Sequence, residues 1–257
     1  MNPSLVEATL EALRAVKGDV GFYARTLPGG APCEFQADLP LVAASVIKLP
    51  ILVEAFARFA EGTLREDEVF EIRPEHKMPS CGALTYLHDG LKVTALDLAT
   101  LMIILSDNTA TNLLIDRLGI EAINARMAAL GIPDVALRRK LFDAEQSARG
   151  IENTVTARGM GLLLERMVAG TLLGPEADAR MLKILGDQRL NGKLPFYLHS
   201  ADIDVAHKTG EDEGITHDVG VVFSREPFVI CMLSNRVDVP PFERLIQETA
   251  RAWAGLE

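Results

Sequence analysis

Ser45 and Lys48 lie three positions apart near the start of an apolar stretch, residues 41–59, with the sequence LVAASVIKLPILVEAFARF. Residues at this spacing share one face of a helix, so the hydroxyl and the amine can meet. An amine held in apolar surroundings can remove the hydroxyl proton and make the serine a nucleophile. The alternative is a serine that caps the helix and a lysine whose amine reaches solvent, and for this pair alone that alternative is favoured.

Two further motifs change that balance. Ser106-Asp107-Asn108 and Lys208-Thr209-Gly210 each occur once and follow the first pair in order. Taken alone, Ser106 could cap a helix and Lys208 could be a solvated lysine on a strand. Residue frequencies predict all three motifs together in roughly one of ten thousand chains of this composition. The combination therefore indicates one catalytic site, in which Asp107 is expected to be structural.

The three motifs S-x-x-K, S-D-N and K-T-G are the signature of class A β-lactamases and penicillin-binding proteins. The chain resembles this family over nearly its whole length. The segments TLMIILSDNTATNLLIDRLG and HKTGEDEGITHDVGVVF are similar to a helix and a strand pair of the family. The resemblance implies an α/β (α+β) fold of the β-lactamase/transpeptidase type, in which helices flank an antiparallel sheet beside an all-helical lobe.

The resemblance also implies catalytic roles. Ser45 would attack a carbonyl carbon and become an acyl ester, and Lys48 would relay protons. Burial and the charge of nearby Lys208 would lower the pKa of Lys48, so that its amine could be neutral. The backbone N–H groups of Ser45 and Glu211 would hold the oxyanion. Ser106 would pass a proton to the leaving nitrogen.

Substrate-binding roles follow from the same resemblance. Asn108 would donate a hydrogen bond to the amide carbonyl of the substrate, and Lys208 and Thr209 would hold its carboxylate. Gly210 would let the substrate lie against the strand. His217 stands where many family members carry an arginine that helps to bind the carboxylate. A neutral histidine would bind a carboxylate more weakly at pH 7.

The largest departure from the family lies in a long connection, residues 133–153. Loops of this length in compact domains are usually functional or disordered. Class A β-lactamases carry there a glutamate, in an E-x-x-x-N pattern, that activates the deacylating water. This chain reads LRRKLFDAEQSARGIEN and lacks the pattern. The distance from Ser106 points to a position near Phe142.

The nearest carboxylates in that connection are Asp143 and Glu145. Asp143 is the better replacement by position, although its side chain is one methylene shorter. The alternative is that Asp143 forms an ion pair with Arg138 or Arg139 and holds the loop. Without a replacement base the acyl-enzyme would hydrolyse slowly, as in a penicillin-binding protein.

The site residues must be positioned by the surrounding elements, which hydrophobic periodicity and turn residues predict. Thr94 and Asp97 read as a capping box at the start of a buried helix. Strands are expected near both ends of the chain, and helices between them. Helices are predicted over 3–17, 41–59, 94–105, 109–118, 121–130, 154–168, 175–185 and 240–256, and strands over 20–26, 32–37, 202–210, 216–224 and 227–235.

This order predicts two interlocked domains. Residues 1–60 and 190–257 would build a discontinuous α/β domain. Residues 61–189 would form a helical domain that carries the loop 133–153 near the active site. A binding site is expected in the crevice between the two domains.

Composition limits the partners. The chain has 257 residues, of which 48% are hydrophobic, and a formal net charge of −10, which argues against a nucleic acid or an anionic membrane as partner. No apolar run is long enough to span a bilayer. The first residues resemble an amphipathic helix and no secretory signal, so a cytoplasmic location is expected, or a periplasmic or secreted one if an export signal has been removed.

The three cysteines are far apart and suit a reducing compartment. No metal motif and no cofactor fingerprint occur, so we expect neither a metal nor a cofactor. The expected partner is a small β-lactam or a peptide-like amide or ester, bound by a monomer.

Three hypotheses on function remain open. The first is a class A-type β-lactamase that works through an acyl-serine. The second is a related esterase, peptidase or amidase that reacts with β-lactams incidentally. The third is a non-enzymatic penicillin-binding or sensor module that stops at the acyl stage.

Overall fold

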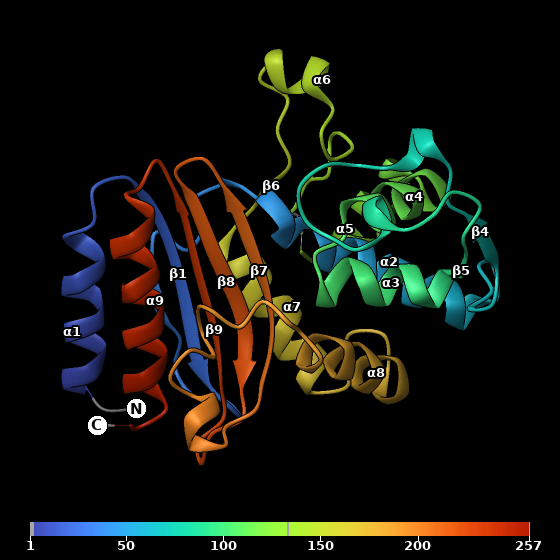
Figure 1. Ribbon diagram of the computed structural model, residues 1–257. Helices are drawn as coiled ribbons and strands as arrows, with labels where there is room; N and C mark the ends of the chain where they lie inside the picture. Colours follow the sequence, from blue (N-terminus) through green and yellow to red (C-terminus); the bar gives the residue numbers. More distant parts are fainter. Residues whose placement is uncertain (1–2, 133, 257) are drawn as a thin grey trace.

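The two ends of the chain build one sheet in the computed structural model, which describes residues 3–132 and 134–256 (Figure 1). Its five strands are ordered β2-β1-β9-β8-β7, and every neighbouring pair is antiparallel. The predicted strands are confirmed, with ends that move by a few residues. They are β1 (Asp19–Thr26), β2 (Cys33–Phe35), β7 (Val205–Asp212), β8 (Ile215–Val222) and β9 (Phe228–Asn235).

Two helices from the opposite ends of the chain cover one face of the sheet (Figure 1). The first, α1, spans Pro3–Arg14 and ends three residues earlier than predicted, and α9 spans Val239–Trp253. Buried apolar side chains from both helices pack on the sheet, and the Trp253 ring lies 6.1 Å from that of Phe22 in an edge-to-face arrangement. The first helix, α1, thus packs beside the last helix, α9.

The opposite face of the sheet is covered by α7 and continues into the helical part of the molecule (Figure 1). A single apolar cluster runs from sheet residues such as Val219 and Val229 into this part and includes most of α2. The molecule therefore has the predicted α/β class, with helices on both faces of an antiparallel sheet, while the domain boundaries near residues 60 and 190 stay a prediction. The helices are α2 (Lys48–Glu61), α3 (Ala95–Ile104), α4 (Asn108–Leu118), α5 (Ile120–Ala129), α7 (Ala157–Val168) and α8 (Pro175–Gly186).

The segment around Ser45 differs from the predicted continuous helix. It begins with a short strand, β3 (Leu41–Val42), which is followed by one 3₁₀ turn, η1 (Ala44–Ile47), and α2 begins only at Lys48. Pro50 has no N–H, which the first turn of an α-helix tolerates and a later turn does not. The 3₁₀ geometry still places residues i and i+3 directly above one another, so Ser45 and Lys48 meet as expected.

The connection between α2 and α3 contains short elements. It holds β4 (Val69–Glu71), which pairs with β5 (Lys92–Thr94), and the 3₁₀ turns η2 (Pro74–His76) and η3 (Leu84–Tyr86). The capping box at Thr94 and Asp97 is confirmed. Within the described ranges, no helix has the length and hydropathy that crossing a bilayer would require.

The described part of the connection 133–153 starts at 134 and closes on itself at its base. Ala136 and Thr154 form an isolated bridge, and β6 (Thr154–Val155) pairs with β3. One short helix, α6 (Ala144–Ala148), lies within it, and the loop projects from the rest of the molecule in Figure 1. The remaining 3₁₀ turn, η4, spans His199–Ala201.

Gly161 in α7 tests the contact between this helix and the sheet. A Cβ at Gly161 would lie 2.3 Å from Cδ1 of Tyr23 in β1, so we expect Gly161→Ala to lower the free energy of unfolding by about 1–3 kcal/mol. Gly186→Ala in α8 is the matched control, because its Cβ would meet nothing within 4 Å. Thermal unfolding followed by circular dichroism should show a lower Tm for Gly161→Ala only, and equal Tm values would contradict this packing.

Candidate active site

The amine of Lys48 is the centre of the candidate site. The residue is 0% exposed, and its Nζ lies 2.9 Å from Ser45 Oγ, 2.9 Å from Ser106 Oγ, 2.8 Å from the Ser106 carbonyl and 2.8 Å from Asn108 Oδ1. Four oxygens from three separate positions thus converge on one nitrogen. Three of the predicted site residues are brought together by this single side chain.

A second buried amine approaches from the sheet. Lys208 in β7 is 0% exposed, and its Nζ donates to Ser106 Oγ at 3.1 Å and to the Thr209 carbonyl at 2.8 Å. The Ser106 hydroxyl therefore bridges the amines of Lys48 and Lys208. This links the helical part of the molecule to the edge strand of the sheet.

The two amines do not keep ordinary lysine pKa values. Burial, and then the charge of Lys208, hold the pKa of Lys48 well below its usual range. Burial lowers the pKa of Lys208 to about 7, and the charge of Lys193 adds to this effect, while Asp218 partly offsets it. Desolvation disfavours the charged form of both amines, so the neutral form of the amine beside the Ser45 hydroxyl is more accessible than in a solvent-exposed lysine.

The turn between α3 and α4 holds Ser106 in a left-handed backbone conformation, with φ 53°. A non-glycine residue rarely adopts this region, so the surroundings must compensate for the strain. Asp107 supplies that support, because its carboxylate accepts the backbone N–H groups of Ala83, Leu84 and Ala110. Asp107 is therefore structural, as predicted.

Polar contacts tie the Ser45 segment to the sheet and to the loop. The N–H of Val42 donates to Asn235 Oδ1 at 2.8 Å, and the N–H of Ala43 donates to the Asn153 carbonyl at 2.8 Å. Ala44 then has φ 42°, which turns the chain sharply just before the serine. Ser45 thus follows a strained residue, and the two residues before Ala44 are hydrogen-bonded to the sheet and to the loop.

The expectation that His217 contacts a substrate carboxylate is wrong. The residue is 0% exposed, its Nε2 donates to the Val42 carbonyl at 2.8 Å, and its Nδ1 accepts the N–H of Ser234 at 3.0 Å. Burial lowers its pKa to about 4, so the ring is neutral. His217 joins the nucleophile segment to the sheet and has no free nitrogen for a ligand.

A cavity of about 300 Å³ collects the remaining predicted residues. Gly210 also has a packing reason, because a Cβ there would lie 3.0 Å from Cδ2 of His217 and 3.2 Å from Cγ2 of Val46. The absence of a side chain at Gly210 thus also makes space for the His217 ring. The cavity is lined by Ser45, Ser106, Asn108, Asp143, Thr209, Gly210 and Glu211, among others.

Asp143 lies on the loop side of this cavity. Its carboxylate caps α6 by accepting the N–H of Gln146 at 3.1 Å. The alternative ion pair with an arginine is wrong for the described residues, because Arg139 pairs with Glu152 at 2.5 Å and Arg138 donates to the Glu152 carbonyl. Asp143 therefore combines a capping role with a place beside the cavity.

Phe142 precedes it in a left-handed conformation, with φ 61°, and is 51% exposed. Its aromatic side chain also lines the cavity. The position that the sequence distance marks for the missing glutamate is therefore held by an apolar side chain.

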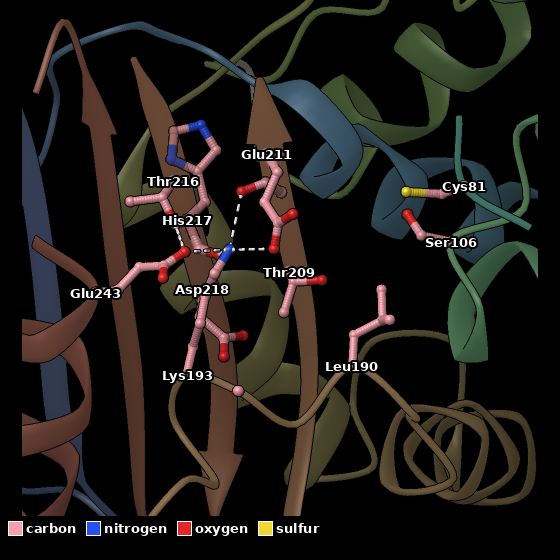
Figure 2. A network of polar contacts seen from close by, with 12 residues as sticks. Cys81, Ser106, Leu190, Lys193, Thr209, Glu211, Thr216, His217, Asp218 and Glu243 are labelled. Atoms are coloured by element: carbon pink, nitrogen blue, oxygen red, sulfur yellow. Dashed lines mark hydrogen bonds and ion pairs between the residues drawn. The ribbon is translucent and has the colours of Figure 1, made fainter. Parts of the chain in front are cut away.

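Several residues near the cavity escaped sequence reasoning. Cys81 and Ser106 face β7 from the helical side in Figure 2, and Cys81 lines the cavity with Leu190. Asn153 holds the loop base by accepting the N–H groups of Arg138 and Arg139. No motif marks these residues, because each reaches the site through distant contacts.

Lys193 was also missed. It follows Asn191-Gly192 and would read locally as an exposed lysine in a turn, yet it is 3% exposed and lies beneath the end of β7. Its contacts across the sheet bury it, and these cannot be read from neighbouring residues.

The arrangement can carry out proton transfer around a nucleophile. The Ser45 hydroxyl lies within hydrogen-bond distance of an amine, and a second hydroxyl on the same amine offers a path onward. Across residues 3–132 and 134–256, no three side chains of His, Cys, Asp or Glu gather as metal ligands would.

Comparison with known proteins places this geometry in a family. Residues 4–254 match the model of the Beta-lactamase enzyme family. A beta-lactamase of Mycobacterium tuberculosis is 26% identical over 98% of this chain and 85% of its own length.

Solved structures agree over a similar extent. The crystal structure of a beta-lactamase from Sphaerobacter thermophilus superposes with a TM-score of 0.89 at 30% identity and covers 99% of this chain and 98% of that one. The structure of PBP-A gives a TM-score of 0.88 at 29% identity and covers 98% of this chain and 95% of that one.

Proposed function

The chain belongs to the beta-lactamase enzyme family, and we propose that it is a serine hydrolase that acts on β-lactams through an acyl-serine intermediate, in the manner of class A enzymes. The observation that carries the proposal is the position of Lys48 Nζ, 2.9 Å from both Ser45 Oγ and Ser106 Oγ. A nucleophile, a base and an onward proton path are thereby assembled in one buried cluster.

In the first step, Ser45 Oγ attacks the carbonyl carbon of the lactam while its proton passes to the neutral amine of Lys48. Burial and the charge of Lys208 favour that neutral amine before the step. The three oxygens that Ser106 and Asn108 place around Lys48 then stabilise the ammonium that forms. The site is thus arranged for the charge that develops during the attack.

The carbonyl oxygen becomes an oxyanion during this attack. The N–H of Ser45 belongs to the turn that leads into α2, and the N–H of Glu211 belongs to the edge strand β7. Both residues line the cavity. These two donors are the proposed oxyanion hole, and each such donor contributes about 3–4 kcal/mol in well-studied hydrolases.

Collapse of the tetrahedral intermediate breaks the bond between the carbonyl carbon and the lactam nitrogen. The nitrogen takes the hydroxyl proton of Ser106, and the ammonium of Lys48 returns a proton to that hydroxyl. The 2.9 Å contact between the Lys48 amine and Ser106 Oγ supports this relay. The product of the step is the acyl ester on Ser45, in which the lactam ring is open and the protonated nitrogen stays tethered to the acyl group.

The substrate is proposed to lie along β7. A charged Lys208 and the Thr209 hydroxyl would hold its carboxylate. The Asn108 amide donates one N–H to the Pro79 carbonyl at 3.0 Å, so its second N–H serves the substrate amide carbonyl. Binding therefore depends on the protonation state of Lys208.

Hydrolysis of the acyl ester requires a base for water, and Asp143 is proposed for that role. It lines the same cavity as Ser45 and has no ion pair with Arg138 or Arg139 within the described residues. The same carboxylate also caps α6 through the N–H of Gln146, and its side chain is one methylene shorter than that of a glutamate.

A second candidate function is therefore a penicillin-binding or sensor protein with slow deacylation. It is favoured by Phe142, which occupies the loop position where a glutamate is expected. The similarity to PBP-A, of which a mutant has been solved as an acyl-enzyme complex with penicillin G, supports the same possibility. A related esterase, peptidase or amidase is the third hypothesis.

Intact mass after mixing with a chromogenic cephalosporin tests the proposal directly. We expect a covalent adduct on the native chain and none on Ser45→Ala, because this substitution removes the only proposed nucleophile. Far-ultraviolet circular dichroism of Ser45→Ala should match the native spectrum. An equal adduct on the variant would refute the assignment of Ser45.

Asp143→Asn tests whether Asp143 activates the deacylating water. If Asp143 activates the water, the acyl-enzyme should decay about 10²–10⁴-fold more slowly in the variant, while it forms at the native rate. The decay is followed by intact mass after excess substrate is removed. Glu145→Gln on the same loop is the control, and equal decay rates in all three proteins would leave Asp143 as the cap of α6 alone.

The pH profile tests the role of Lys208. Because its pKa is about 7, the free enzyme loses this charge as the pH rises through 7, and kcat/KM for a carboxylate-bearing β-lactam should fall there. An arginine stays charged at every accessible pH, so Lys208→Arg should keep its kcat/KM up to at least pH 9. A decline near pH 7 in both proteins would assign it to another group.

A further inference from the structure

Lys193 approaches the end of β7 from the loop between α8 and β7. Figure 2 shows its side chain rising beneath the strand and its amine among oxygens of β7, β8 and α9. The Nζ lies 3.3 Å from the Gly210 carbonyl oxygen and 3.3 Å from that of His217. It also lies 2.9 Å from Glu211 Oε1 and 3.9 Å from Glu243 Oε1. A buried ammonium is thus shared between two carbonyls and two carboxylates.

The Gly210 carbonyl belongs to the same planar peptide group as the N–H of Glu211. In a trans peptide these two bonds point in opposite directions. Gly210 pairs with His217 of β8, and both carbonyls meet the same amine, so the Gly210 oxygen points toward β8. Because β7 is the edge strand, the N–H of Glu211 points to the free side, where the cavity lies.

We propose that Lys193 is a positioning residue that orients and polarises the Gly210–Glu211 peptide, so that the N–H of Glu211 becomes a stronger oxyanion donor. This inference rests on the proposed acyl-serine function. The ammonium draws electron density toward the Gly210 oxygen and leaves the N–H of the same peptide more positive. An oxyanion bond that is fixed and strengthened before the reaction lowers the barrier to attack.

The loop around Lys193 is held in a way that suits this role. Asn191 Oδ1 contacts His207 Nε2 at 3.0 Å, and the N–H of Leu194 donates to Asp218 Oδ2 at 3.0 Å. From α9, Gln247 Nε2 donates to the Gly192 carbonyl at 2.8 Å. The three residues that flank Lys193 are therefore each anchored, and the amine has little freedom to leave the Gly210 carbonyl.

A purely structural role is the competing explanation, in which Lys193 only neutralises the carboxylates of Glu211 and Glu243. The two explanations differ at the acyl carbonyl of the adduct. A stronger oxyanion donor lengthens that C=O bond and lowers its stretching frequency, whereas neutralising a carboxylate elsewhere does not. Infrared difference spectra of the adduct, with a ¹³C-labelled β-lactam carbonyl, report this frequency.

Lys193→Met removes the ammonium and keeps much of the side-chain volume. We expect the acyl C=O stretch to move to higher frequency and the acylation rate to fall by about tenfold, less than the 10²–10³-fold loss of a whole donor. Lys193→Arg should restore most of both. The measurements are made at pH 6, below the pKa of about 7 of Lys208 in the native chain. Removal of the Lys193 charge then has little effect on the protonation of Lys208.

Glu243→Gln is the control, because it removes one carboxylate near Lys193 and leaves the Gly210 contact in place. It should change neither the stretch nor the acylation rate. If Lys193→Met does not fold by circular dichroism, Lys193→Gln replaces it and should give a shift in the same direction.

The outcomes distinguish a failure of the proposed function from a failure of the positioning role of Lys193. Absence of any adduct on the native chain contradicts the proposed function itself. An adduct with the same C=O frequency in the native chain and in the folded Lys193 variant overturns the positioning role and leaves the function intact. A shift in Glu243→Gln equal to that in Lys193→Met would overturn it as well, because the carboxylate balance would then be its cause.

Discussion

A lysine amine removed from water is stable only where oxygens surround it or where it loses its proton, and Lys48 uses both possibilities. Its contacts join the turn that carries Ser45 to the turn that carries Ser106 and Asn108. One of these turns belongs to the chain that leaves the sheet, and the other connects two helices. The contacts that build the site are therefore also contacts that hold these two turns together.

The sheet contributes a second buried amine and a fixed edge. Lys208 stands on β7 and shares the Ser106 hydroxyl with Lys48, so the charge of Lys208 raises the free energy of protonating Lys48. Behind the strand, His217 fills the space left by Gly210 and ties β8 to the chain before Ser45. The proposed chemistry thus depends on packing that a substrate never contacts.

We propose that the fate of the acyl-enzyme depends on a different part of the molecule, the loop 134–153, which lines one side of the cavity. The base of this loop is well connected, because Asn153 binds the backbone of Arg138 and Arg139 and accepts the N–H of Ala43. Its tip offers an exposed Phe142 and a carboxylate that caps a short helix. The proposed acylating centre is therefore combined with a loop of different chemistry, and we propose that the balance between hydrolysis and trapping depends on that loop.

Local sequence patterns were sufficient to predict much of the secondary structure and the residues of the candidate site. The three short motifs predicted one site with Ser45, Lys48, Ser106 and Lys208, and the structure brings these side chains together. Periodicity predicted most helices and the antiparallel strands, because these features depend on neighbouring residues. The tertiary structure decided the rest. In the structure, His217 is buried and joins β8 to the segment before Ser45. The predicted helix at the nucleophile is divided into a 3₁₀ turn and α2, and Lys193 is buried next to the edge strand. The reason is physical, since contacts between residues far apart in the chain arise only when the layers pack, and burial then sets each side chain's charge and partners.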